Sequence, residues 1–360
     1  MDKNNYVAIM AGGIGSRFWP MSRTGMPKQF LDILNIGRTL IQSTYDRFEK
    51  FIPKENIYVV TSAQYLEIVK EQLPELVEAN ILCEPSRKNT APCIAYISYK
   101  LNELDPNANL ICAPADHLIT EPEAFIEICK NALHFTSHIK ALITLGIKPT
   151  NPNTGYGYIQ YESMAAGDNI YKVKLFTEKP DKELAQTFVA SGDFLWNAGI
   201  FVWQVKNIIT AFETNIPELH EVFDAEKENF NTDKEEDAIE RIYPQCTNVS
   251  IDYAVMEKAD NVYVIPASFG WSDLGTWTSA YETFDKDYLD NAVGGNEVMI
   301  IDATKNMVQV PHNKLVVLQG LDDFIVVDTE DVLLICKKDK EQEIKNYVAE
   351  VKRNKGDKYL

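Results

Sequence analysis

The stretch over residues 11–30 combines a glycine-rich turn with three cations and contains no acidic residue. The glycines of the turn are Gly12, Gly13 and Gly15, and the cations are Arg17, Arg23 and Lys28. Glycine adopts positive φ without strain, which allows a tight turn to lay its backbone N–H groups against a ligand oxygen. Guanidinium groups bind phosphate oxygens in pairs, and an ammonium group acts as a mobile point charge. Because the whole chain carries a formal net charge of −18, this local positive charge predicts a phosphate site.

Two common glycine-rich phosphate motifs do not fit this stretch. Phe18 stands where the dinucleotide fingerprint needs its third small residue, and the chain contains no GxxxxGK[ST] sequence. The whole segment AGGIGSRFWPMSRTGMPKQF instead resembles the sugar-1-phosphate nucleotidyltransferases, and within that family the mannose-1-phosphate guanylyltransferases. The resemblance implies Mg²⁺-dependent transfer of GMP from GTP to α-D-mannose 1-phosphate, with GDP-mannose and diphosphate as products. It implies catalytic roles for Arg17 and Lys28 and nucleotide contacts for the three glycines.

The segment after the third expected strand carries a carboxylate, an amide and two cations. Guanine presents two N–H donor groups beside an O6 acceptor, so Glu84 is suited to the donors and Asn89 or a neighbouring backbone N–H to the acceptor. The alternative is that Asn89 and Thr90 cap a helix beside a solvated basic turn, and the residues alone leave both interpretations open. The resemblance implies nucleotide contacts for Glu84, Asn89 and Thr90. It leaves open whether Arg87 or Lys88 takes the family's arginine role.

Asp116 follows the fourth expected strand, at the sheet edge where the phosphate turn is also expected. An aspartate there is suited to hold Mg²⁺, whose remaining ligands are water and substrate oxygens. The alternative is a turn or a helix cap, which Asp-His sequences often form. The family's P-x-D-H motif implies that Asp116 binds the metal, and the family-specific segment over residues 269–277 implies that Asp273 is the second ligand. We expect His134 and His138, four residues apart on a helix, at the surface.

A second set of polar residues lies further along the chain. Glu178 and Lys179 end an expected strand over residues 174–180, where a lysine is able to clamp a phosphate and a glutamate to accept sugar hydroxyls. For an isolated Glu-Lys-Pro sequence, a solvated charge pair beside a helix is the simpler alternative. The resemblance implies that Lys179 is catalytic at the sugar 1-phosphate, and that Gly157, Glu178 and Asn197 contact the sugar.

Apolar strands alternate with helices through the first part of the chain. Strands are expected over residues 6–10, 57–61, 81–84, 110–113 and 142–146, and helices over residues 40–48, 63–73, 90–104 and 123–138. This order predicts βαβ units and an α/β fold, a doubly wound, mixed and mainly parallel sheet in a Rossmann-like nucleotidyltransferase domain. Ligands bind outside the carboxyl ends of strands in such sheets, so the loops after the strands position the groups named above.

From residue 291, short apolar runs recur about every eight to ten residues, which predicts a small β-rich, short β-helix-like module. A charged helix over residues 340–352 follows it. We therefore divide the chain into a catalytic domain, residues 1–288, and a C-terminal domain, residues 289–360. The resemblance assigns the second domain to assembly as a homodimer. We expect its deletion to leave a recognisable nucleotide site.

Composition narrows the function classes. The chain has 360 residues, is 45% hydrophobic and contains no run of about 18 apolar residues that would span a membrane. Its amino terminus lacks the pattern of a signal peptide, so the cytoplasm is the expected location. The six cysteines show no CxxC spacing and are expected as buried free thiols. The acidic balance argues against nucleic acid or a membrane as a partner, which leaves small-molecule substrates.

Two rival functions stay open. One keeps the transfer but changes the base or the sugar, for example uridylyl transfer to glucose 1-phosphate. The other is a regulatory nucleotide-binding subunit without catalysis. The intact set of charged residues argues against the second rival: Arg17, Lys28, Asp116 and Asp273.

Overall fold

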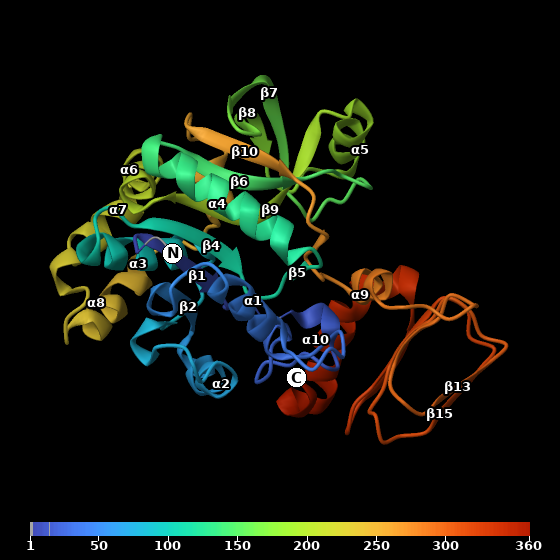
Figure 1. Ribbon diagram of the computed structural model, residues 1–360. Coiled ribbons are helices and arrows are strands. Elements are labelled where there is room, and N and C mark those ends of the chain that lie inside the picture. The colour runs from blue at the N-terminus through green and yellow to red at the C-terminus, as the bar shows by residue number, and fades with distance from the viewer. Residues whose placement is uncertain (1–2, 14) are drawn as a thin grey trace. The chain divides into compact units, whose positions relative to one another are not determined.

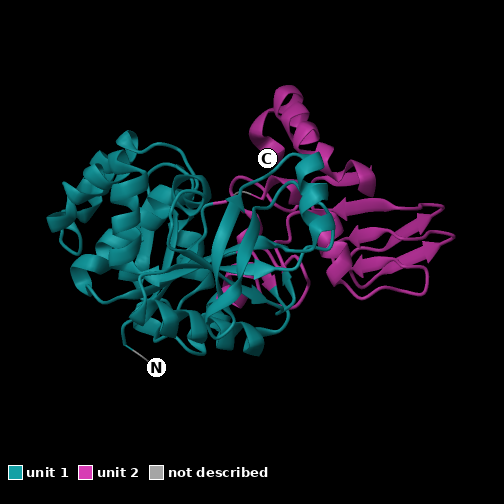
Figure 2. Cartoon of the chain, turned by 90° about the horizontal axis from the view of Figure 1, so that it is seen from above, with its two compact units in different colours: residues 1–12, 45–115, 119–271 teal, residues 13–44, 116–118, 272–360 magenta. Residues whose placement is uncertain are grey.

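The structure, a computed structural model, describes residues 3–13 and 15–360. The chain forms two compact units (Figure 2). Unit 1 contains residues 1–12, 45–115 and 119–271, and unit 2 contains residues 13–44, 116–118 and 272–360. Since unit 2 joins stretches far apart in the sequence, most of the glycine-rich turn belongs to the same unit as the C-terminal residues. The domain boundary after residue 288 stays a prediction.

Unit 1 is built on a nine-stranded sheet with the order β3-β2-β1-β4-β9-β6-β10-β8-β7. Parallel pairs join β1 to β2 and β4, β2 to β3, and β6 to β10, whereas β7, β8 and β9 run antiparallel to their neighbours. The strands are β1 (Asn5–Met10), β2 (Ile57–Ser62), β3 (Ile81–Glu84), β4 (Asn109–Pro114), β6 (Leu142–Ile147), β7 (Tyr158–Gly167), β8 (Ile170–Thr177), β9 (Phe194–Gln204) and β10 (Val262–Ala267). The predicted α/β class with a mixed sheet is confirmed.

Helices cover both faces of this sheet, which is why strand β1 reads as a continuous apolar run. On one face, α3 packs with α6 and α7 over the side chains of Ala8 and Leu110. Helix α4 crosses the other face over β4, β6 and β9 (Figure 1). The helices are α1 (Leu40–Glu49), α2 (Leu66–Gln72), α3 (Thr90–Leu104), α4 (Pro122–His138), α5 (Lys182–Ser191), α6 (Val205–Asn215), α7 (Pro217–Asp224) and α8 (Glu235–Ile242).

Strand β9 is the main element that the sequence analysis did not predict. It lies in the middle of the sheet, antiparallel to both β4 and β6, so the predicted fourth and fifth strands are not neighbours. Its pairing with β6 shifts register between Thr144 and Gly146, and Gly199 within it has a φ of 66°. Such irregularities redirect side chains. Asn197, one of the predicted site residues, is paired with Gly146 at this irregularity.

Unit 2 contains a four-stranded sheet, β12-β14-β16-β17, and a separate pair, β13-β15. Its strands and helices are β12 (Ala292–Gly294), β13 (Val298–Ile301), β14 (Met307–Gln309), β15 (Val316–Gln319), β16 (Phe324–Asp328), β17 (Leu333–Lys337), α9 (Trp277–Thr283) and α10 (Ile344–Lys355). The short strands β5 (Leu118–Ile119) and β11 (Trp271–Ser272) form a two-stranded sheet where the chain passes between the units. The β-rich C-terminal module is therefore confirmed.

The core of unit 2 joins the glycine-rich turn to the C-terminal residues. Phe18 and Trp19 from the turn pack in one cluster with Trp277, Ile325 and Ile344. The Phe18 and Trp277 rings lie 4.9 Å apart between centroids. The turn therefore shares its core with the C-terminal module, which argues against the expectation that deleting the module leaves a recognisable nucleotide site.

Three further expectations, on membrane spans, cysteines and the histidine pair, are compared with the described residues. None of the helices there has the length and apolar character to cross a membrane. Five cysteines are buried and Cys83 is half-buried, and all six are free thiols. His134 and His138 are both exposed, as predicted.

Candidate active site

A cavity of about 320 Å³ lies within unit 2. Its lining contains five predicted site residues and four others: Gly15, Arg17, Lys28, Asp116 and Asp273, with Ser16, His117, Gly275 and Lys345. These side chains come from separate stretches of the chain. A cavity of this size that gathers cations and carboxylates is suited to a small charged ligand.

The glycine-rich turn is held by side chains that follow it. Gly15 has a φ of 65°, and a Cβ at this position would lie 2.4 Å from the Cβ of Lys28. The position therefore requires glycine for both conformation and space. Ser22 Oγ donates to the Gly15 carbonyl at 2.7 Å, and Gln29 Nε2 donates to the Gly13 carbonyl at 2.9 Å. Ile14 lies outside the described residues.

Lys28 is buried, which differs from the mobile charge that the sequence predicted. Its Nζ lies 2.9 Å from Asp116 Oδ2 and donates to the carbonyl oxygens of Asp273 and Leu274 at 2.9 and 3.0 Å. Burial would raise the pKa of Asp116, but the Lys28 ammonium and then His117 outweigh burial and lower it below its ordinary value. Asp116 is therefore an anion at neutral pH, as a metal ligand must be.

Asp273 is fixed by the backbone that follows it. Its Oδ1 accepts a hydrogen bond from the Gly275 N–H at 3.0 Å, and a Cβ at Gly275 would lie 2.6 Å from Oδ2. Among residues 3–13 and 15–360, no group of three or more His, Cys, Asp and Glu side chains gathers as a metal site. Mg²⁺ commonly uses one or two carboxylates and takes its other ligands from phosphates and water. The two aspartates of the cavity fit that donor set.

The two arginines of the turn have different partners. Arg17 lines the cavity, and its Nε donates to Gln342 Oε1 at 3.1 Å. Arg23 does not line the cavity, and its guanidinium binds the Asp331 carboxylate through both terminal nitrogens. Arg23 therefore contacts the C-terminal module and does not line this cavity, and its part in a phosphate site stays a prediction.

Unit 1 holds the predicted nucleoside residues. Tyr243 Oη donates to Glu84 Oε1 at 2.9 Å, and a Cβ at Gly12 would lie 3.6 Å from Glu84 Oε2. Burial raises the pKa of Glu84 to about 7, against the lowering effects of Tyr243 and Arg87. Glu84 is 5% exposed, so this carboxyl group is a buried acceptor with one oxygen satisfied.

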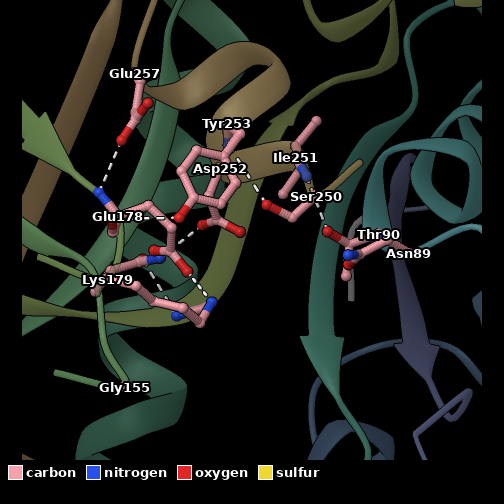
Figure 3. Close-up of polar contacts among 12 residues, drawn as sticks. Asn89, Thr90, Gly155, Glu178, Lys179, Ser250, Ile251, Asp252, Tyr253 and Glu257 are labelled. Carbon is pink, nitrogen blue, oxygen red and sulfur yellow. Dashed lines mark hydrogen bonds and ion pairs between the residues drawn. The ribbon is translucent and has the colours of Figure 1, made fainter. Parts of the chain in front are cut away.

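Asn89 caps the start of helix α3, as the helix-cap alternative predicted. The Asn89 side chain accepts a hydrogen bond from the Thr90 N–H at 2.9 Å at the start of α3. Thr90 Oγ1 accepts from the Ile251 N–H at 2.9 Å (Figure 3). Arg87 is also engaged, because it donates to Tyr65 Oη at 2.5 Å and lies over the Tyr65 ring. A direct role of Asn89 and Thr90 at a nucleotide stays a prediction.

Three of the predicted sugar residues, Gly157, Glu178 and Asn197, form a buried polar cluster in unit 1. The fourth, Lys179, is exposed beside Glu178 (Figure 3). Lys179, with a φ of 46°, pairs with Glu178 Oε1. The Lys179 side chain is 53% exposed and the Glu178 side chain only 5%, so the solvated charge pair considered as the alternative is solvated on one side only. A Cβ at Gly157 would lie 2.6 Å from Glu178 Oε2. That oxygen is buried and has no hydrogen-bond partner within the described part of the chain. A buried unsatisfied acceptor of this kind is suited to a ligand hydroxyl.

Asp252 belongs to the same cluster and was missed by the sequence analysis. Asn197 Nδ2 donates to Asp252 Oδ1 at 2.8 Å, and Asn197 Oδ1 accepts from Thr144 at 2.6 Å. Burial and then the Glu178 charge raise the pKa of Asp252 to about 7. Asp252 begins a π-helical turn over Asp252–Met256, a feature frequent at functional sites. The sequence around Asp252 offers only Ser250, a residue type that often begins a helix, and this does not single out the aspartate.

The chain matches the nucleotidyl transferase family over residues 6–289. It belongs to the nucleotidyl transferase family. A second match, to the MannoseP isomerase/GMP-like beta-helix domain, covers residues 295–351. This nucleotidyl transferase therefore carries the cavity residues on segments from both matched regions, because Lys345 lies in the second.

Similar proteins cover nearly the whole of this nucleotidyl transferase. A mannose-1-phosphate guanylyltransferase of Salmonella montevideo is 36% identical over 352 residues, which are 96% of this chain and 73% of the relative. One from Escherichia coli K12 is 35% identical over 357 residues, with 96% and 73% covered. A solved structure from Thermus thermophilus, described as a mannose-1-phosphate geranyltransferase, has a TM-score of 0.86 and 28% identity and covers 97% of this chain and 99% of that one.

Proposed function

We propose that the protein transfers GMP from GTP to α-D-mannose 1-phosphate, giving GDP-mannose and diphosphate. The observation that carries the proposal is the cavity of unit 2, which combines cations for a polyphosphate with two carboxylates for a metal. Nucleotidyl transfer needs that combination. The choice of base and sugar follows the names of the relatives, which are mannose-1-phosphate guanylyltransferases.

The reaction needs positioning and neutralisation of charge. A phosphate oxygen of mannose 1-phosphate attacks the α-phosphorus of GTP, the bond from that phosphorus to the bridging oxygen breaks, and its electron pair leaves with diphosphate. Arg17 stabilises the charge on the leaving group, Lys28 adds its positive charge from behind Asp116, and Lys179 binds the sugar phosphate. Mg²⁺, when held by Asp116 and Asp273, supplies further charge neutralisation. Lys28 keeps Asp116 ionised for that purpose.

Base choice is assigned to Glu84, behind Gly12. Its buried carboxyl has one oxygen satisfied by Tyr243, and the other faces the position of the missing Gly12 side chain. The donors N1–H and N2–H₂ of guanine would satisfy that oxygen, whereas uracil offers a single N–H. Asn89 and Thr90 shape the neighbouring turn and complete the proposed nucleoside site.

Sugar binding is assigned to the cluster that contains Gly157, Glu178, Asn197 and Asp252. Glu178 offers its unsatisfied Oε2 to a hydroxyl, and Gly157 leaves the room for that hydroxyl. Asn197 and Asp252 are bound to each other and provide a second polar edge. Carboxyl groups that are buried and preorganised discriminate strongly against analogues without the matching hydroxyl.

We propose a homodimer that works in the cytoplasm, where GTP is made. The C-terminal module carries apolar side chains that are about half exposed: Met299, Ile301, Leu315, Val317, Leu333 and Ile335. Met299, Ile301 and Val317 lie on the paired strands β13 and β15, and Leu333 and Ile335 lie on β17 of the other sheet. Exposed apolar groups of this number are typical of an interface between proteins. The opposing face of a second copy would cover them.

The decisive experiment is a substrate matrix. Purified protein is incubated with Mg²⁺, with GTP, ATP or UTP, and with mannose, glucose or N-acetylglucosamine 1-phosphate, and products are separated by chromatography. GDP-mannose should form fastest, and Arg17→Ala should lower turnover by about 10²–10³-fold. UDP-glucose as the main product would establish the first rival function. Binding of GTP without any product would establish the regulatory one.

A further inference from the structure

Two cations from distant parts of the chain line the cavity of unit 2. Arg17 lies in the turn that follows the glycines, and Lys345 lies in the first turn of α10. Neither forms an ion pair with a carboxylate of the described residues, although Lys28 in the same cavity is paired with Asp116. Positive charge is therefore left uncompensated in this part of the cavity, which is the condition for binding an anion.

The two cations influence each other. The pKa of Lys345 is lowered from its ordinary value, first by the charge of Arg17 and then by burial. Such repulsion is relieved when an anion binds between like charges. A phosphate group is the anion that this nucleotidyl transferase must hold.

Helix α10 is packed into the core of unit 2, and this packing places Lys345 at the cavity. Ile344, the residue before it, is fully buried in the cluster that holds Phe18 and Trp19. Trp19 Nε1 donates to the carbonyl oxygen of Tyr359 at 2.8 Å. Gln342 accepts from Arg17 Nε at 3.1 Å and fixes the direction of that guanidinium. The turn and the helix therefore present their cations together.

We propose that Lys345 is a phosphate-binding residue of the nucleotide site, that it binds the diphosphate portion of GTP together with Arg17, and that Gln342 positions Arg17. This inference rests on the proposed function. It extends the site into the β-helix-like region, outside the part of the chain that matches the nucleotidyl transferase family. The leaving diphosphate gains negative charge as the bond to the α-phosphorus breaks, and Lys345 stabilises that charge without any covalent step.

The test compares Lys345→Gln and Lys345→Arg with a control on the same helix. Lys352→Gln removes a charge of the same kind, but Lys352 does not line the cavity and pairs with Asp357 at 3.0 Å. Calorimetry measures the binding of inorganic diphosphate and of GTP. Kinetics of the reverse reaction give the KM for diphosphate, and those of the forward reaction give the KM for mannose 1-phosphate.

Lys345→Gln should weaken diphosphate binding and raise the KM for diphosphate by about tenfold to a hundredfold, as expected for one charge-assisted hydrogen bond. The KM for mannose 1-phosphate should stay within about twofold of wild type, and Lys345→Arg should restore most of the binding. Lys352→Gln should behave as wild type. Unchanged diphosphate binding in Lys345→Gln, or an equal loss in Lys352→Gln, overturns the proposal.

The positioning role of Gln342 has its own readout. Gln342→Ala should lower kcat, and the loss should disappear when Arg17 is already Ala, because the two residues act as a unit. Independent losses overturn this part. If the wild type binds diphosphate but makes no GDP-mannose, the calorimetry still decides the role of Lys345, so failure of the proposed function is distinguished from failure of this inference.

Discussion

The ammonium group of Lys28 lies 2.9 Å from the carboxylate of Asp116, and the two side chains differ in exposure, at 4% and 29%. The pair therefore presents its carboxylate to the cavity and keeps most of its cation behind it. Without any substrate bound, Lys28 already forms an ion pair with Asp116, the proposed metal ligand. This arrangement makes the charge state of Asp116 dependent chiefly on a single neighbour.

Replacing Lys28 by Met should reverse the contribution of Asp116 to the pH dependence of stability. In the wild type the pKa of Asp116 is lowered, so its contribution is present above the unfolded value of about 3.9 and is lost as the pH falls through the folded pKa. Without the ammonium, burial dominates and the folded pKa rises above the unfolded value. The variant should then gain stability, relative to wild type, as the pH falls from 7 to about 4.

Urea unfolding at several pH values measures this difference. Lys50→Met is the matched control, because Lys50 pairs with Glu123 at 3.4 Å with both side chains exposed. Its unfolding curve should follow the wild type at every pH. Parallel pH curves for Lys28→Met and wild type would show that Lys28 does not set the charge state of Asp116.

Asp116→Asn and Asp273→Asn should each remove most activity, and the double variant should lose little more. Both residues line one cavity and are proposed to hold one metal ion, and residues that act as a unit give losses that are not additive. Turnover at increasing Mg²⁺ and Mn²⁺ concentrations measures the effect, with EDTA as the zero point. Full activity in EDTA, or two losses that multiply, would contradict a shared metal.

Glu84→Gln should stabilise the protein at pH 8 and impair base choice. The pKa of Glu84 is raised to about 7, so the wild type loses stability as the pH rises from about 4.3 through 7. The neutral amide keeps an acceptor for Tyr243 and removes that loss, which we expect to raise the free energy of unfolding at pH 8 by about 1–3 kcal/mol. At pH 5 the difference should be small.

The same variant should use GTP less well, by about 1–3 kcal/mol in kcat/KM, because an amide N–H faces the donors of guanine. ITP lacks the N2 amine and should be a poorer substrate than GTP for the wild type. Equal use of GTP and ITP by the wild type would remove the assignment of Glu84 to the base.

Deleting residues 291–360 should destroy nucleotide binding. The deletion exposes Phe18, Trp19 and Trp277, which pack against the removed Ile325 and Ile344. Ile344→Ala, which leaves the chain complete, should already lower the free energy of unfolding by about 2–5 kcal/mol. Calorimetry with GTP and urea unfolding check both variants. A truncated protein that binds GTP as the full chain does would contradict this dependence.

Val317→Asp should convert the proposed dimer to a monomer. Val317 is 53% exposed and lies directly across from Met299 on the paired strand. A charge buried in an apolar interface is strongly unfavourable. Sedimentation velocity over a range of concentrations measures the change. Tyr288→Asp, at an exposed position outside these strands, should leave the association unchanged, and a wild type that sediments as a monomer throughout would refute the dimer.

The sequence predicted the helices and strands whose own residues favour the structure that the tertiary fold also requires. Helix α3 has the predicted bounds, Thr90–Leu104, because helical periodicity and an asparagine cap both mark it. Strand β9 was missed because the Asn-Ala-Gly sequence inside it is typical of a turn, and only pairing with two neighbours makes it a strand.

The candidate site likewise contains residues that local sequence motifs predicted and residues that only the tertiary structure brings in. The motifs that surround Lys28, Asp116 and Asp273 indicated phosphate and metal chemistry, but their convergence on one cavity depends on tertiary packing. Lys345 carries no signal, since it is one cation in a basic helix. Arg17 and Gln342 are 325 positions apart, and no local pattern predicts a contact over that separation.

Unit 2 combines an early segment of the chain with a late one, so its core is completed only late in synthesis. Residues 13–44 leave the ribosome well before the strands and helix that complete their core, which lie from residue 272 onward. At a translation rate of about 5–20 residues per second, Phe18 and Trp19 wait for more than about ten seconds without their final neighbours. A nascent chain therefore has no finished phosphate cavity until α10 is made, and chaperones that bind exposed aromatic segments have that interval in which to act.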